Sequence, residues 1–165
     1  MIAALDVHYD EASQTATAAA VVFEQWNDAV PTAEYKALCS VIQPYEPGNF
    51  FKRELPCLLA VLNIVKEPMS LIVIDGYVSL GEKPGLGMRL WETIDKRTPI
   101  IGVAKTRFHS ADAVEVTRGN SKTPLFVTSV GIEPEVAGEH LRQMHGLFRI
   151  PTLLKRADQL ARQQI

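Results

Sequence analysis

Residues 69–77 read Met-Ser-Leu-Ile-Val-Ile-Asp-Gly-Tyr, with the apolar run Leu71–Ile74 leading directly into Asp75 and Gly76. Three of the four apolar residues are β-branched, which is typical of a strand that is buried on both faces. Because ligands of open α/β sheets bind at the carboxyl ends of strands, Asp75 is a candidate site residue. Asp-Gly is also a common turn dipeptide, so an ordinary turn that closes a core strand remains an equal alternative.

Length and composition indicate one domain spanning residues 1–165. Hydrophobic residues make up 47% and charged residues 22%, which excludes a disordered or fibrous chain. The formal net charge of -2 argues against bulk electrostatic capture of nucleic acid, but a local basic face would still permit binding.

Two cysteines, Cys39 and Cys57, are too few for a disulfide framework. The first residues lead straight into a strand rather than a signal peptide. No apolar run approaches the ~20 residues of a membrane-spanning helix. We therefore expect a cytoplasmic, monomeric protein with reduced thiols and no membrane partner.

The first third of the chain reads as three strands and a helix. Alternation and turn residues predict strands over Ile2–Tyr9, Thr15–Glu24 and Ala33–Ile42 that pair antiparallel. Two prolines make residues 44–48 a stiff loop. Helical spacing predicts a helix between Asn49 and Lys66 that begins near Pro56 or is kinked there, with Glu54 just before that proline.

The rest of the chain alternates strands and helices. The expected elements are a loop over Ser79–Leu86, a helix over Gly87–Lys96, a buried strand over Pro99–Ala104, paired strands over Asp112–Arg118 and Leu125–Ser129, and helices over Pro134–His145 and Pro151–Arg162. This order predicts a single α/β domain.

Acids stand on the first strand, near the helix start and after the buried strand: Asp6, Glu54 and Asp75. If the first strand lies beside the one ending at Asp75, the three carboxylates converge, and a divalent cation would relieve their repulsion. Hard oxygen ligands suit Mg²⁺ or Mn²⁺. Such an ion supports phosphodiester hydrolysis, and Lys105, after the next strand, could orient water or offset charge. Three acids out of 19 are weak support alone, because chance supplies such a set in most chains.

Basic residues fall largely in loops and element ends, where phosphate contacts could form, although scattered surface residues would give the same count: Lys52, Arg53, Lys83, Arg89, Lys105, Arg107, Arg118 and Lys122. Near the C-terminus, Arg149, Lys155, Arg156 and Arg162 are expected to form a solvated helix face.

The stretches around the acids carry a more specific pattern. In chain order they are Ala4-Leu5-Asp6-Val7 with Tyr9, Pro44-Tyr45-Glu46-Pro47-Gly48 with Phe51-Lys52-Arg53-Glu54-Leu55-Pro56, Ile74-Asp75-Gly76, Pro99-Ile100-Ile101-Gly102-Val103-Ala104-Lys105, and Arg149-Ile150-Pro151. Together they resemble the endonuclease V family, enzymes that cleave strands near deaminated bases such as hypoxanthine. The resemblance implies a ribonuclease H-like α/β fold, in which three antiparallel strands and then parallel strands form a mixed central sheet flanked by helices.

The same resemblance implies roles for individual residues. Asp6, Glu54 and Asp75 match the metal-binding acids, Lys105 matches the catalytic lysine, and DNA or RNA becomes the expected partner. Residues 44–47 match a wedge that separates strands, with Tyr45 at its tip; two prolines would hold that ring outward, although a ring folded onto the domain is the simpler alternative. The expected nucleic-acid contacts are Pro44, Tyr45, Glu46, Pro47, Gly48, Arg53, Gly76 and Lys83.

The chain also departs from the family pattern. Gly81–Gly85 replaces a His-Pro-Arg stretch, and a histidine of the following helix is replaced by Leu90 or Trp91. Gly131-Ile132 replaces a Gly-His pair, which removes a group able to bind metal. Two alternatives follow: a weakly active or inactive member that binds nucleic acid, and a nuclease selective for distorted strands.

Overall fold

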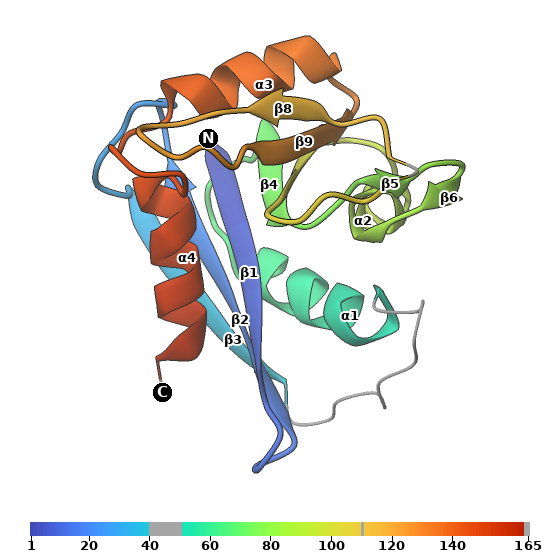
Figure 1. Ribbon diagram of the computed structural model, residues 1–165. Helices are drawn as coiled ribbons and strands as arrows, with labels where there is room; N and C mark the ends of the chain where they lie inside the picture. Colours follow the sequence, from blue (N-terminus) through green and yellow to red (C-terminus); the bar gives the residue numbers. More distant parts are fainter. Residues whose placement is uncertain (40–50, 110, 164–165) are drawn as a thin grey trace.

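The computed structural model describes residues 1–39, 51–109 and 111–163 (Figure 1). The strands are β1 (Ile2–Asp10), β2 (Thr15–Phe23), β3 (Ala33–Cys39), β4 (Leu71–Asp75), β5 (Ser79–Leu80), β6 (Lys83–Pro84), β7 (Ile100–Ala104), β8 (Val114–Val116) and β9 (Leu125–Val130). The helices are α1 (Phe51–Leu62), α2 (Leu86–Thr93), α3 (Pro134–Gln143) and α4 (Thr152–Arg162).

Seven strands form one mixed sheet in the order β3-β2-β1-β4-β7-β9-β8. The predicted antiparallel pairing of β1, β2 and β3 is confirmed. Strand β4 pairs parallel with both β1 and β7, whereas β9 pairs antiparallel with β7 and with β8. The parallel centre is therefore flanked by antiparallel strands on both sides.

Two predicted segments differ in detail. The loop predicted over Ser79–Leu86 contains the short β5–β6 hairpin. Of the two predicted alternatives, a start near Pro56 is wrong: α1 begins at Phe51, and Pro56 lies inside it although proline cannot donate to the carbonyl four residues earlier. Glu54 consequently lies in the first turn of α1. The predicted helix start at Asn49 lies outside the described residues.

Apolar layers cover both faces of the sheet. Because side chains alternate along a strand, β2 sends Val21 and Phe23 into the layer under α3 and α4, and Ala20 and Val22 into the layer under α1 and α2. All four are fully buried. Figure 1 shows α4 on one side of the sheet and α1 on the other. In the described part of the chain, no helix is long and apolar enough to cross a bilayer.

Candidate active site

The register of the parallel strands brings two predicted acids together. Leu5 of β1 is opposite Ile74 of β4, so Asp6 and Asp75 emerge side by side at the carboxyl edge of the sheet. Asp75 in turn is opposite Val103 of β7. Lys105 therefore emerges at the same edge, directly after β7 ends.

These three side chains also share a face. The residue two positions before each of them is buried in the apolar layer under α3 and α4: Ala4, Val73 and Val103. Since strand side chains repeat every two residues, Asp6, Asp75 and Lys105 point toward that same side.

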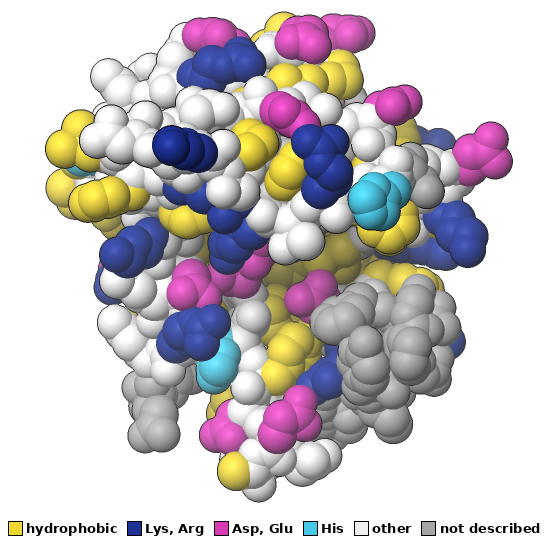
Figure 2. Space-filling view, viewed as in Figure 1, with side chains coloured by type: hydrophobic (Ala, Val, Ile, Leu, Met, Phe, Trp, Pro, Cys, Tyr) yellow, Lys and Arg dark blue, Asp and Glu magenta, His cyan; other side chains and the backbone are white. Residues whose placement is uncertain are grey.

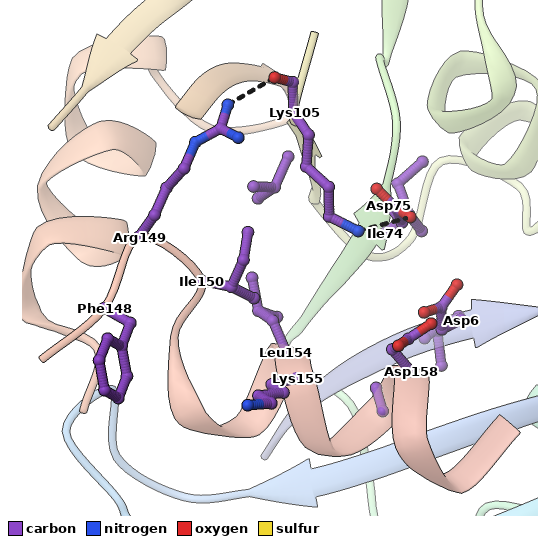
Figure 3. A pocket seen from close by; sticks show the side chains of 13 residues that line it. Asp6, Ile74, Asp75, Lys105, Phe148, Arg149, Ile150, Leu154, Lys155 and Asp158 are labelled. Carbon is purple, nitrogen blue, oxygen red and sulfur yellow. Dashed lines mark hydrogen bonds and ion pairs between the residues drawn. The ribbon is translucent and has the colours of Figure 1, made fainter. Parts of the chain in front are cut away.

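The three residues line one cavity of about 370 Å³. Figure 3 shows its opposite wall, which is built by α4 and the residues just before it. The lining from that wall is Phe148, Arg149, Ile150, Leu154, Lys155, Ala157 and Asp158. Figure 2 shows acidic side chains gathered in a hollow of this face, with Lys and Arg side chains nearby.

Lys105 is held against Asp75 by contacts on its main chain and side chain. Its Nζ lies 3.5 Å from Oδ2 of Asp75, and both side chains are about half exposed. Arg149 donates to the Lys105 carbonyl (Figure 3). The Tyr77 hydroxyl donates to the Thr106 carbonyl at 2.7 Å, which fixes the chain just beyond Lys105.

Asp75 is followed by a true turn. Gly76 has φ of +121°, a conformation that favours glycine, and its N–H donates to the Val103 carbonyl at 2.9 Å. A Cβ on Gly102 would lie 2.5 Å from the Gly76 carbonyl oxygen, so glycine in β7 lets the turn cross closely. The Asp-Gly pair thus closes the strand and also leaves the carboxylate in the cavity.

Burial and mutual repulsion weaken the acidity of two carboxyl groups. Burial, followed by the charges of Asp75 and Asp158, raises the pKa of Asp6 to about 7, although the Val7 N–H donates to it at 2.8 Å. Burial, followed by the charges of Asp75 and Asp6, likewise raises the pKa of Glu54 to about 7. Glu54 reaches this electrostatic cluster from α1, across the sheet from α4.

The donor chemistry of this edge fits a hard divalent cation. Within residues 1–39, 51–109 and 111–163, no group of three or more Asp, Glu, His or Cys side chains is arranged so that it could hold a metal ion. The carboxylates of Asp6, Asp75 and Glu54 nevertheless repel one another, and Lys105 is the cation beside Asp75. Carboxylate oxygens are ligands that suit Mg²⁺ or Mn²⁺.

The expected nucleic-acid contacts are spread over several places. Arg53 donates to Glu11 at 2.9 Å and lies 4.2 Å from the ring centre of Tyr9, so its guanidinium packs on the β1–β2 hairpin. Exposed Lys83, on β6, lines a second cavity of about 680 Å³. Residues 44–47, the expected wedge, and Gly48 lie outside the described residues.

Helix α4 contributes a carboxylate that the sequence analysis missed. Asp158 lies in the cavity, and its charge contributes to the raised pKa of Asp6. One feature of the sequence could have indicated that Asp158 faces the sheet. It follows buried Ala157 and precedes buried Ala161 by three residues, at the margin of the apolar face of α4. Its Oδ1 accepts a hydrogen bond from Arg162 Nε at 2.8 Å.

The interpretation of the C-terminal basic residues as a solvated helix face was wrong for Arg149, which lies before α4, whereas Lys155 is exposed on that helix. Arg149 donates to the carbonyls of Lys105 and Pro124, so its guanidinium lies inside the fold. Exposed Lys155 lines the cavity. A count of basic residues cannot show which of them face a neighbouring sheet edge.

Ile132 lies far from the acids in the sheet. Val130 of β9 is opposite Ile100, the first residue of β7, so Gly131-Ile132 follows at the edge where β7 begins. Lys105 follows the other end of β7. The expected loss of a metal-binding position through Ile132 therefore does not concern the edge that carries Asp6 and Asp75.

Comparison with known proteins agrees with this geometry. Residues 1–150 match the sequence model of the family described as Endonuclease V. Endonuclease V of Streptomyces avermitilis is 34% identical over 187 aligned residues, which cover 99% of this chain and 80% of the relative. The chain belongs to the endonuclease V family.

Solved endonuclease V structures superpose on most of the chain. The crystal structure of the Streptomyces avermitilis enzyme has a TM-score of 0.78 at 32% identity and covers 98% of this chain and 79% of its own. Endonuclease V of Ciona intestinalis, in complex with a 24mer DNA containing an inosine followed by a ribo-adenosine, has a TM-score of 0.82 at 17% identity and coverage of 98% and 83%. At that identity the second likeness shows the fold alone, and the expected ribonuclease H-like fold is confirmed.

Proposed function

We propose that this endonuclease V family protein is a metal-dependent endonuclease that hydrolyses phosphodiester bonds near inosine in DNA or RNA. The observation that carries the proposal is the shared cavity of Asp6, Asp75 and Lys105 at the carboxyl edge of the parallel strands. The Ciona intestinalis relative, solved with inosine-containing DNA, supports this choice of substrate.

In this proposal the carboxylates at the carboxyl edge of the sheet would hold Mg²⁺ or Mn²⁺. Asp6 and Asp75 supply ligands from the sheet, Glu54 approaches from α1, and Asp158 approaches from α4. The bound cation would polarise a phosphoryl oxygen and lower the pKa of a coordinated water. Its positive charge would also relieve the repulsion that raises the pKa of Asp6 and Glu54.

Lys105 is the proposed catalytic lysine. Its ammonium lies at the mouth of the cavity, 3.5 Å from Asp75 Oδ2, where it can orient the attacking water and offset charge that develops on the phosphate. The hydrogen bonds from Arg149 and Tyr77 to this segment keep it in place, so little reorganisation is needed when a strand binds.

The substrate contacts around this centre are part of the same proposal. A Cβ on Gly76 would meet no atom within 4 Å, so the backbone beside Asp75 is open to a nucleotide. Lys83 offers an exposed ammonium on the β5–β6 hairpin. The Arg53 side chain is only 9% exposed, so it would have to leave its ion pair with Glu11 to reach a phosphate. Residues 44–47 remain the proposed wedge.

A nicking assay tests the proposed function. End-labelled DNA and RNA strands with one inosine, beside matched guanosine strands, are incubated with Mg²⁺ or Mn²⁺, with EDTA, and with Asp75→Ala protein. We expect cutting near inosine that requires metal and disappears in the variant. Cutting that persists in Asp75→Ala would refute the proposed site. Equal cutting of mismatched or branched strands without inosine would show that the enzyme recognises the shape of the strand rather than the base.

A further inference from the structure

Two large apolar side chains stand exposed beside the candidate active site. Leu147 and Phe148, in the segment between α3 and α4, are 83% and 75% exposed. Phe148 lines the same cavity as Asp75 and Lys105 (Figure 3). Exposed apolar groups at the rim of a polar site commonly mark a binding surface.

The backbone that presents this pair is fixed by a buried arginine. Arg118 is 5% exposed, and its guanidinium donates to the Leu141 carbonyl at 2.7 Å, to the Met144 carbonyl at 3.0 Å and to the Gly146 carbonyl at 3.2 Å. Its Nε donates to the carbonyl of Phe148 itself at 3.3 Å. The exposed ring is therefore attached to main chain that is held in place by hydrogen bonds from Arg118.

Two further contacts restrict the same segment. A Cβ on Gly119 would lie 2.0 Å from the Leu147 carbonyl oxygen, so the turn between β8 and β9 packs directly on it. On the other side, Arg149 donates to the carbonyls of Lys105 and Pro124, the second at 2.8 Å. The position of Phe148 is thus coupled through one residue to the segment that carries Lys105.

We propose that Phe148, with Leu147 beside it, is a stacking platform for one base of the bound strand, and that Lys155 contacts the phosphate backbone next to it. This inference rests on the proposed function. Proteins bind single strands by combining aromatic rings, which accept any base, with cations along the backbone. Exposed Lys155 lies in the cavity between Phe148 and the acids, which gives this combination (Figure 3).

The location favours a strand over a second copy of the protein. A strand with one phosphate at Asp6 and Asp75 extends in two directions, and the cavity lined by Ile150 and Leu154 leads in one of them to Phe148. A stable protein interface buries about 800 Å² on each partner. An aromatic side chain buries only about 150–250 Å², so this pair alone is too small to hold a dimer. A fixed aromatic ring also loses little conformational entropy when a base stacks on it.

A double-mutant cycle between protein and DNA tests the platform. Binding of a fluorescein-labelled single DNA strand with one inosine is followed by anisotropy in EDTA, so that binding is measured without cutting. An abasic site is moved one position at a time along both sides of the inosine. We expect Phe148→Ala to weaken binding of the intact strand about tenfold, Phe148→Trp to retain it, and Val30→Ala, a control that is also 75% exposed, to leave it unchanged.

The test is whether the loss of affinity from Phe148→Ala and the loss from an abasic site are independent of each other. At one abasic position the wild type should lose about the same tenfold, and Phe148→Ala should lose nothing more. The inference would be overturned if the losses of affinity from Phe148→Ala and from the abasic site were additive at every abasic position. It would also be overturned if Phe148→Ala bound the intact strand as wild type does, with Phe148→Ala and Phe148→Trp both folded as judged by circular dichroism. A change of oligomeric state in Phe148→Ala without a change in DNA binding would assign the pair to a second copy instead. Because no cutting is needed, failure of the nicking assay would refute the proposed function separately.

Discussion

Lys105 and Asp75 form an ion pair that is only half buried, so its contribution to stability is small. We expect Lys105 to matter for the reaction instead. We predict that Lys105→Gln lowers the single-turnover rate on an inosine strand about 100-fold or more, because the charge that offsets the phosphate is lost. The Mg²⁺ concentration for half-maximal rate should stay within about twofold, and the control Lys66→Gln, at an exposed position between α1 and β4, should cut normally. A large increase in that Mg²⁺ concentration would instead make Lys105 part of metal binding.

Asp158 is predicted to act through the metal. In Asp158→Asn the side chain keeps its shape but loses its charge, so we expect the Mg²⁺ concentration for half-maximal cutting to rise about tenfold or more. Glu139→Gln is the matched control, because it also removes an ion pair within a helix, to Arg142, but on α3. Equal Mg²⁺ dependence of Asp158→Asn and wild type would exclude Asp158 from the site.

Individual site residues differed in how far the sequence could reveal them. Asp6, Asp75 and Lys105 stand at or just beyond the ends of buried strands, and strand adjacency alone brings them together. Asp158 could not be placed, because its relation to Asp6 depends on how α4 packs across β1 and β2. Arg149 was assigned to solvent because nothing in the local sequence shows the carbonyls of Lys105 and Pro124 that it meets.

At the scale of elements, Arg118 joins the end of α3 to the segment before α4. Six carbonyl oxygens between Leu141 and Phe148 accept hydrogen bonds from this one buried guanidinium. We predict that Arg118→Met lowers the free energy of unfolding by roughly 2–4 kcal/mol, because these acceptors lose their donors. Arg142→Met, which removes only an exposed ion pair to Glu139, should cost less than about 1 kcal/mol.

Urea denaturation of both variants measures the difference. A loss in Arg118→Met no larger than that in Arg142→Met would show that water replaces the guanidinium and that the segment is not clamped. Arg118 was grouped from the sequence with residues able to contact phosphate. Its burial follows from the packing of β8 against α3, a contact between elements about 20 residues apart that local pattern does not report.

The helices and strands themselves were largely predictable, because apolar periodicity marks both. Buried β4 and β7 were recognised from continuous apolar runs, and the β1–β3 meander was recognised from alternation and turn residues. The antiparallel insertion of β9 between β7 and β8 was not predicted. It decides that Gly131-Ile132 lies at the opposite edge from Lys105, and so changes how the departure from the family pattern is interpreted.

At the scale of the whole molecule, the acid cluster links stability to pH and metal. The pKa of Asp6 rises from an ordinary 3.8 to about 7 in the folded protein. Below about pH 4 the group is protonated in both states. Between pH 4 and 7 it ionises only in the unfolded chain, so the folded state binds more protons and stability falls as pH rises; above 7 the loss is complete.

We therefore predict that, in EDTA, Asp6→Asn becomes more stable than wild type as pH rises from about 4 to 7, by on the order of 2–4 kcal/mol, with no further gain above pH 7. Mg²⁺ at pH 8 should stabilise wild type but not Asp6→Asn. Urea denaturation across this range tests it, with exposed Asp112→Asn as control. If the stability advantage of Asp6→Asn over wild type shrank as pH rises, the result would contradict the raised pKa of Asp6.

Mn²⁺ binding, followed by electron paramagnetic resonance at pH 7.5, tests directly whether Asp6 and Asp75 form a metal centre. Wild type is compared with Asp75→Asn and with the control Glu139→Gln, without any nucleic acid present. If the carboxyl edge of β1 and β4 is the metal centre, Asp75→Asn weakens Mn²⁺ binding at least tenfold and the control binds like wild type. Equal Mn²⁺ binding by all three proteins would place the metal elsewhere and contradict a metal centre at Asp75.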